Sequence, residues 1–412
     1  MQIDTSDELP SLGGTMNIAE RISRLGTETA FAVSAEAAAF AAEGHKVYPF
    51  HLGDLNFLTP ANIIAAATKA MQDGKTGYCP NAGIPQLREI IAADISASHG
   101  IPYTMENVAV QPGGKPTIGK FLQTVMNPGD EVLYPNPGFP IYESQIKFHG
   151  GIAVPYGYFE AKENFDIDLD MLEKKITPKT RLLILNDLQN PTGAECSPEQ
   201  FEKLAEIVNT HNLFVLVDEA YFDIRYEGES ISFASLPGMA ERSVILYTFS
   251  KKFAMTGWRL GATIGPKEII DVITRLNVND ESCPNHFVQY AAIEALSGDQ
   301  TEVRQILETL KERRDAAVGI LNSIEGVRCI CPNATFYLYP NVTGAMQKKG
   351  LSDYDDFRLA VLRETGVSFC TRLHFGSALE GEDKFYIRLA YSGIDISEIK
   401  EGLGKFKAFF ES

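Results

Sequence analysis

Short apolar runs alternate with an amphipathic helical pattern in the middle of the chain. The runs RLLILN, FVLV and SVILYT occupy Arg181–Asn186, Phe214–Val217 and Ser243–Thr248. Between the first two, Pro198–Thr210 places Phe201, Leu204, Ala205 and Val208 on one helical face. Uninterrupted apolar runs are typical of strands buried on both faces of a parallel sheet. Since such strands need crossover helices, the pattern predicts an α/β domain.

The pattern changes after about residue 300. A long charged amphipathic helix is predicted over Glu302–Asn322, and a final helix ends the chain. Between them lie strand-like runs at Val327–Cys331, Thr335–Tyr339 and Phe385–Ala390. These elements predict a smaller α+β domain.

A helix predicted at about Phe31–Ala42 precedes the sheet and is expected to join the smaller domain. The expected division has three parts: residues 1–58 as an N-terminal segment of the small domain, 59–300 as the large domain, and 301–412 as the small C-terminal domain.

Charge and composition narrow the classes of partner. The chain has 54 acidic and 37 basic residues, a net charge of −17, so we expect neither nucleic acid nor an anionic membrane as partner. The acidic N-terminus does not resemble a signal peptide, and no apolar segment reaches the length of a membrane span. The six cysteines form no CxxC pair, and the seven histidines lack metal-ligand spacing. We therefore expect a cytoplasmic protein without a metal site.

Two adjacent lysines follow the last apolar run, in the segment TFSKKFAMTGWRLG. Burial and a nearby cation lower the pKa of a lysine and make its amine nucleophilic, which suits Lys251 or Lys252. Arg259 carries a planar fork suited to phosphate, and Thr248 and Ser250 add hydroxyl donors. The segment predicts an imine-forming amine beside an anion clamp. The alternative is a surface loop with ordinary charges.

Polar residues also follow other predicted strands. Asp218 stands at the carboxyl end of its strand, where it could pair with a protonated ring nitrogen or begin a helix. Tyr221 could donate to a phenolic oxygen, and Asn190 lies in NPTG, which alone indicates only a turn. Gly113 and Gly114, in QPGGK, precede a helical pattern whose first amides could bind an anion.

Together these groups match a ligand with a phosphate, an aldehyde, a phenolic oxygen and a basic ring nitrogen, which describes pyridoxal phosphate. The chain resembles the class I/II aminotransferases among the fold-type I pyridoxal-phosphate enzymes, and most closely their aspartate-aminotransferase-like subgroup. The resemblance runs from ISRLGTETAFAV near Ile22 to FYIRLAYS near Phe385. It implies an aminotransferase with a mostly parallel, mixed seven-stranded sheet flanked by helices and a smaller α+β domain.

The resemblance also implies roles for residues at the cofactor. Lys251 corresponds to the catalytic lysine that forms the Schiff base and then acts as general base, with Lys252 as the second choice. Asp218 corresponds to the acid that keeps the pyridine nitrogen protonated. Asn190 and Tyr221 correspond to partners of the phenolic oxygen. The implied phosphate cup comprises Gly114, Lys115, Thr248, Ser250 and Arg259.

Further correspondences concern stacking, substrate and partner subunit. Phe139 matches the aromatic side chain stacked on the cofactor ring, although it could be a core residue. Arg388 matches the arginine that binds the substrate α-carboxylate, with Gly53 and Asn190 beside it. Without the resemblance, Arg388 would be interpreted as an ordinary arginine of a strand. Tyr78 matches a tyrosine that reaches the neighbouring subunit's phosphate, which implies a homodimer with shared sites.

The amino donor is indicated less directly. Lys115 matches a position that can contact a distal substrate carboxylate, which favours aspartate or glutamate, or it serves only the phosphate. The loop NVNDESCP places Asp280 and Glu281 where relatives carry small or neutral residues. These acids could favour a cationic substrate or could simply be solvated. Departures from the family at Arg372 and Thr335 also bear on side-chain specificity.

Three other functions are compatible with parts of this pattern. The same cofactor site serves enzymes of β- or γ-elimination and substitution, and transaminases for cationic or aromatic amino acids. A cofactor-sensing transcription regulator would need a basic DNA-binding domain ahead of this one. Because only about 20 acidic-leaning residues precede the aminotransferase-like start, we discount the regulator.

Overall fold

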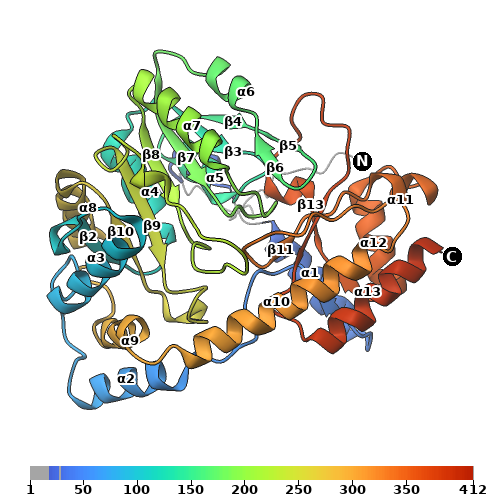
Figure 1. The fold of residues 1–412 in the computed structure, drawn as a ribbon, viewed down its shortest axis with the longest axis horizontal. Helices are drawn as coiled ribbons and strands as arrows, with labels where there is room; N and C mark the ends of the chain where they lie inside the picture. The colour runs from blue at the N-terminus through green and yellow to red at the C-terminus, as the bar shows by residue number, and fades with distance from the viewer. Residues whose placement is uncertain (1–17, 27–28, 412) are drawn as a thin grey trace.

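The computed structural model describes residues 18–26 and 29–411 and contains a seven-stranded mixed sheet, which lies in the left-hand part of Figure 1. β10 pairs antiparallel with both of its neighbours, and the other strands pair in parallel. The expected sheet is thus confirmed. In spatial order the strands are β2 (Val108–Gln111), β10 (Gly261–Ile264), β9 (Ser243–Thr248), β8 (Phe214–Asp218), β7 (Thr180–Asn186), β3 (Glu131–Pro135) and β4 (Ile152–Tyr156).

Both faces of the sheet are buried. Successive side chains of each strand point to opposite faces, and each face packs in its own hydrophobic core. In β7, Leu182 and Ile184 pack in one core, and Leu183 and Leu185 pack in another. The first core includes α4 (Lys115–Val125), α5 (Ile141–Phe148) and α8 (Lys267–Asp280). The second includes α2 (Ala61–Gln72), α3 (Pro85–His99), α6 (Leu169–Lys174), α7 (Pro198–Thr210) and α9 (His286–Ser297).

A further core, the C-terminal core, lies beside the sheet. In Figure 1 the long helix α10 (Thr301–Leu321) runs from α2 and α9 towards α12 and α13. The C-terminal core also takes residues from N-terminal β1. We propose that the sheet and this core correspond to the two domains expected from the sequence. The remaining elements are α1 (Ala30–Ala42), α11 (Thr343–Lys348), α12 (Tyr354–Thr365), α13 (Ile396–Glu411), β1 (Tyr48–Pro49), β5 (Tyr158–Glu160), β6 (Phe165–Ile167), β11 (Tyr337–Leu338), β12 (Val367–Ser368), β13 (Cys370–Thr371) and β14 (Ile387–Ala390).

The C-terminal strands are shorter than predicted, although the predicted helices at α1 and α10 are confirmed. Val327–Cys331 forms no strand, and only Arg328 makes an isolated bridge, to Asn341. Val327 and Cys329 are buried there individually, without a ladder. Thr335 has a positive φ of 67°, which interrupts extended backbone, so β11 begins only at Tyr337.

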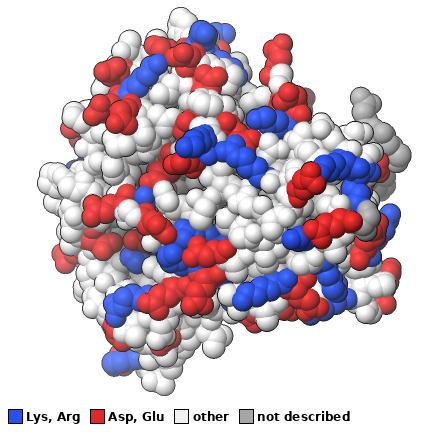
Figure 2. Space-filling model, turned by 45° about the vertical axis from the view of Figure 1, so that its right-hand side comes forward, with Lys and Arg blue, Asp and Glu red and all other residues white. Residues whose placement is uncertain are grey.

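Acidic side chains are spread between basic ones over the face drawn in Figure 2. No helix in the described ranges has the length and apolar character needed to cross a membrane. The acidic N-terminal stretch that argued against a signal peptide falls within residues 1–17, outside the described residues.

Candidate active site

A cavity of about 670 Å³ lies where the carboxyl ends of β7, β8 and β9 meet the C-terminal core. Ligand sites at this edge are typical of parallel α/β sheets. The cavity brings together predicted residues from distant parts of the chain: Gly53, Gly114, Lys115, Phe139, Asn190, Asp218, Tyr221, Thr248, Ser250, Lys251, Arg259 and Arg388.

The two adjacent lysines point to different places. The Lys251 Nζ donates to the Gly53 carbonyl at 2.9 Å and lies 5.4 Å from the centre of the Phe336 ring. Lys252 is absent from the cavity lining and forms an ion pair with Asp223 at 3.1 Å. The geometry therefore favours Lys251 over Lys252 as the amine that meets a ligand.

Asp218 is the last residue of β8 and is buried. Its carboxylate accepts hydrogen bonds from the Tyr142 hydroxyl at 2.6 Å and from the Ala220 N–H at 3.1 Å. Burial raises the pKa of Asp218 to about 6, against the lowering effect of these two donors. A buried carboxylate with neutral donors is suited to pairing with a cationic ligand group.

A polar cup lies at the start of α4 and the end of β9. Gly113 is outside the cavity lining, but its φ of +97° suits glycine, and a Cβ there would come within 2.1 Å of Arg259 Nη2. Gly114 precedes α4, so backbone N–H groups of the first helical turn lie at the cavity. The Thr248 hydroxyl donates to Ser250 Oγ at 2.9 Å. Helix amides, hydroxyls and the Arg259 guanidinium together suit an anion such as phosphate.

Arg388 is a buried cation between two aromatic rings, with its guanidinium carbon 4.6 Å from the Tyr337 ring centre and 4.7 Å from that of Phe375. It donates to the His51 carbonyl at 2.5 Å and to Asn190 Oδ1 at 3.2 Å. Its Nε is buried and has no hydrogen-bond partner among the described residues. This arrangement leaves hydrogen-bonding capacity for a carboxylate ligand.

Several predicted residues pack closely around the cavity. The Tyr221 hydroxyl lies 2.8 Å from that of Tyr337, and a Cβ on Gly53 would come within 2.1 Å of the Tyr337 oxygen. The Lys115 Nζ lies 5.4 Å from the centre of the Phe139 ring. Phe139 is half-buried and faces the cavity, so it is available to a planar ligand.

Other residues singled out from the sequence lie elsewhere. The Tyr78 side chain is 88% exposed and outside the cavity lining. Asp280 and Glu281 lie 3.7 and 2.5 Å from the buried Lys120 ammonium and are also outside the lining. Within the chain, these acids therefore balance a buried cation.

The departures from the family near the pocket also have structural roles. Arg372 forms a two-pronged ion pair with Glu382, at 2.6 and 3.0 Å, and does not line the cavity. The Thr335 carbonyl accepts hydrogen bonds from Tyr226 and Tyr391 at 2.6 and 2.9 Å. These contacts orient the surrounding loops.

The structure adds cavity residues that the sequence analysis did not single out: Phe31, Tyr142, Asn186, Tyr337, His374 and Phe375. Burial lowers the pKa of His374 to about 4, so its ring is neutral at pH 7. Tyr142 carried a weak signal, because it stands three residues after Phe139 at the start of a helix.

Comparison with known proteins matches the sequence model of a family described as Aminotransferase class I and II over residues 46–406. An aspartate aminotransferase of Geobacillus stearothermophilus is 35% identical over 88% of this chain and 92% of its own. The structure of a Rhizobium meliloti aspartate aminotransferase aligns with a TM-score of 0.88 at 30% identity, covering 96% of this chain and 99% of its own. The structure of an aromatic aminotransferase from Pyrococcus horikoshii aligns with a TM-score of 0.83 at 31% identity, and the alignment covers 91% of this chain and 98% of that chain.

Proposed function

We propose that this chain, which belongs to the aminotransferase class I and II family, uses pyridoxal phosphate to move an amino group between an aspartate- or glutamate-like L-amino acid and a 2-oxo acid. The observation that carries the proposal is the convergence of Lys251, Asp218, Arg259 and Arg388 on one cavity. We also propose that the enzyme works in the cytoplasm, as expected from its composition.

The cavity residues fit the cofactor. Lys251 would bind its aldehyde carbon, and Asp218 would pair with its ring nitrogen. The α4 amides, Thr248, Ser250 and Arg259 would hold its phosphate, and Asn190 and Tyr221 its phenolic oxygen. Phe139 would cover its ring. When bound, pyridoxal phosphate supplies a ring that withdraws electrons from the substrate α-carbon.

The chain's own groups then position the substrate and move a proton. Arg388 would bind the α-carboxylate through its fork, with Nε available and Asn190 beside it. Once the substrate amine has replaced it, the Lys251 Nζ is the general base that takes the proton from the α-carbon. The Gly53 carbonyl, 2.9 Å from this nitrogen, orients it in the cavity that Arg388 also lines.

The preference for a second carboxylate rests on Lys115. Its ammonium lies 5.4 Å from the centre of the Phe139 ring, and Lys115 and Arg388 both line the cavity. A dicarboxylate could therefore reach one cation with each end. The acidic pair Asp280 and Glu281, which would favour a cationic substrate, is engaged by Lys120.

We further propose a homodimer with shared sites. Tyr78 and Leu58 are each 88% exposed in the single chain, so both are accessible to a second copy. A second copy that covered them would bring Tyr78 towards the partner's phosphate cup, as the family resemblance implies.

The test compares Lys251→Ala with Lys252→Ala, a matched change one residue away. The wild type and Lys252→Ala should convert aspartate and 2-oxoglutarate to oxaloacetate and glutamate, measured by a coupled oxaloacetate assay. Lys251→Ala should be slower by about 10³-fold or more, because it loses both the covalent contact and the base. Near-wild-type transamination by Lys251→Ala, or release of ammonia by the wild type, would contradict the proposal.

A further inference from the structure

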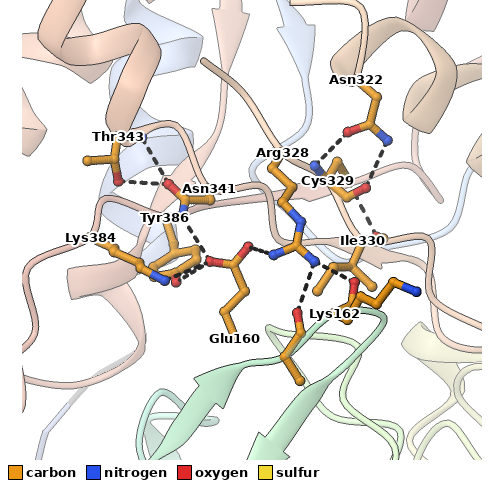
Figure 3. Close-up of polar contacts among 11 residues, drawn as sticks. Glu160, Lys162, Asn322, Arg328, Cys329, Ile330, Asn341, Thr343, Lys384 and Tyr386 are labelled. Carbon is orange, nitrogen blue, oxygen red and sulfur yellow. Dashed lines mark hydrogen bonds and ion pairs between the residues drawn. The ribbon is translucent and has the colours of Figure 1, made fainter. Parts of the chain in front are cut away.

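A buried carboxylate outside the cavity joins the sheet side of the molecule to the C-terminal core. Glu160 ends β5, and its side chain is 2% exposed. Four side chains from residues 328–386 point towards it in Figure 3. Its Oε1 accepts from Arg328 at 2.7 Å, and its Oε2 accepts from Asn341, Tyr386 and Lys384 at 2.9, 2.9 and 3.2 Å.

The donors are themselves held in place. Arg328 and Asn341 exchange backbone hydrogen bonds at 2.9 and 2.8 Å. The Thr343 hydroxyl donates to Asn341 Oδ1 at 2.7 Å, and Tyr386 N–H donates to the Tyr354 hydroxyl at 2.9 Å. Glu160 therefore meets a preformed set of donors, which favours one geometry.

An aromatic cluster supports the same junction. Phe165 of β6 contacts Tyr339 and Tyr386 edge-on, with ring centres 5.6 and 5.7 Å apart, and the two tyrosine rings stack at 5.1 Å. Ala194, in the loop that follows Asn190, belongs to this cluster. The β5–β6 hairpin thus contacts segments that continue into the active site.

Tyr386 leads directly to the cavity. It immediately precedes β14, which carries Arg388. Because side chains alternate along extended backbone, Tyr386 and Arg388 share one face, while Ile387 and Leu389 enter the C-terminal core. Anchoring the Tyr386 hydroxyl therefore limits how β14 can tilt or slide relative to the sheet.

The carboxylate is charged despite its burial. Burial alone favours the neutral acid, but hydrogen bonds from Asn341, Tyr386 and Lys384 lower the pKa of Glu160 below its ordinary value. Lys384 and Arg328 are about half-exposed, so much of the anchoring falls to the more buried Tyr386 and Asn341.

We propose that Glu160 is a positioning residue for the reaction: it ties β14 to the β5–β6 hairpin and so places Arg388 for the substrate α-carboxylate. This inference rests on the proposed function, in which Arg388 binds that carboxylate. Amino acid and 2-oxo acid both present a carboxylate next to the reacting carbon, so loss of the anchor affects both substrates alike.

The experiment measures kcat and KM for aspartate and 2-oxoglutarate in cofactor-loaded wild type, Glu160→Ala, Glu160→Gln and Tyr386→Phe. In Glu160→Ala both KM values should rise by a common factor of about ten, the effect of losing hydrogen bonds to a charged group. The kcat should change less, and the absorbance of the bound cofactor should not change. Tyr386→Phe should reproduce much of the rise, and Glu160→Gln should fall between wild type and Glu160→Ala.

Glu401→Ala is a matched control, because Glu401 also accepts from a tyrosine and a lysine, Tyr48 at 2.5 Å and Lys46 at 2.7 Å. It connects α13 to the β1 region, away from the cavity lining, and should leave both KM values unchanged. Unchanged KM values in Glu160→Ala, or equal changes in Glu401→Ala, would overturn the inference while wild-type transamination still stands. A wild type without transamination would instead overturn the proposed function.

Discussion

Asp218→Asn tests whether a buried charge faces the cofactor. In the folded protein burial raises the pKa of Asp218 from 3.8 to about 6. The folded state therefore holds this proton more tightly than the unfolded chain. Protonated Asp218 therefore stabilises the fold. This contribution is complete below pH 4 and is lost as the pH rises through 6, a change of ~3 kcal/mol in the free energy of unfolding. Asparagine keeps the side-chain shape and cannot ionise.

The assay is urea unfolding of cofactor-stripped wild type and Asp218→Asn between pH 4 and 8. The difference between the two proteins isolates Asp218 from other titrating groups. The variant should gain ~3 kcal/mol relative to wild type across this range. Tyr142→Phe should make the free energy of unfolding fall more steeply with pH than in wild type, because the Tyr142 hydroxyl stabilises ionised Asp218. With cofactor bound, wild type should be the more stable of the two proteins at pH 8, since a cationic ring nitrogen favours ionised Asp218. Parallel stability curves would refute the reasoning.

Two further predictions concern the substrate and the partner subunit. Lys115→Ala should raise KM for aspartate by about tenfold more than KM for alanine, because only aspartate has a distal carboxylate; equal changes would restrict Lys115 to the cofactor phosphate. Mixing Tyr78→Ala protein with Lys251→Ala protein should restore activity above that of either alone, because each hybrid dimer would then hold one intact site. No recovery, with hybrids verified by native mass spectrometry, would mean that Tyr78 does not serve the partner's site.

The sheet could be predicted because its signal is local. Runs such as RLLILN are apolar at every position, which is what burial on both faces of a parallel sheet requires. The C-terminal strands were predicted less well, because in Val327–Cys331 only the single side chains of Val327 and Cys329 are buried, and because Thr335 has a positive φ. Apolar periodicity reports burial, whereas a strand also needs a partner for its backbone.

The candidate site was likewise predictable from the sequence only in part. The chemical groups were visible in the sequence, because polar residues directly after buried strands must lie at the carboxyl edge of the sheet. Which of two adjacent lysines faces the ligand was not visible, since Lys251 meets the Gly53 carbonyl from 198 positions away and Lys252 turns to Asp223. Tyr337 was missed for the same reason, as its contact with Tyr221 spans 116 positions.

The sequence by itself therefore determined the sheet and the kinds of group that its strand ends carry, through local periodicity and residue chemistry. Only the tertiary structure decided how these groups are paired. Lys120 forms ion pairs with Asp280 and Glu281, and Glu382 forms one with Arg372. At the cavity, the Arg388 Nε has no hydrogen-bond partner among the described residues. Such pairing depends on contacts between distant segments, because a charge is available to a ligand only when the fold has left it without a counter-charge.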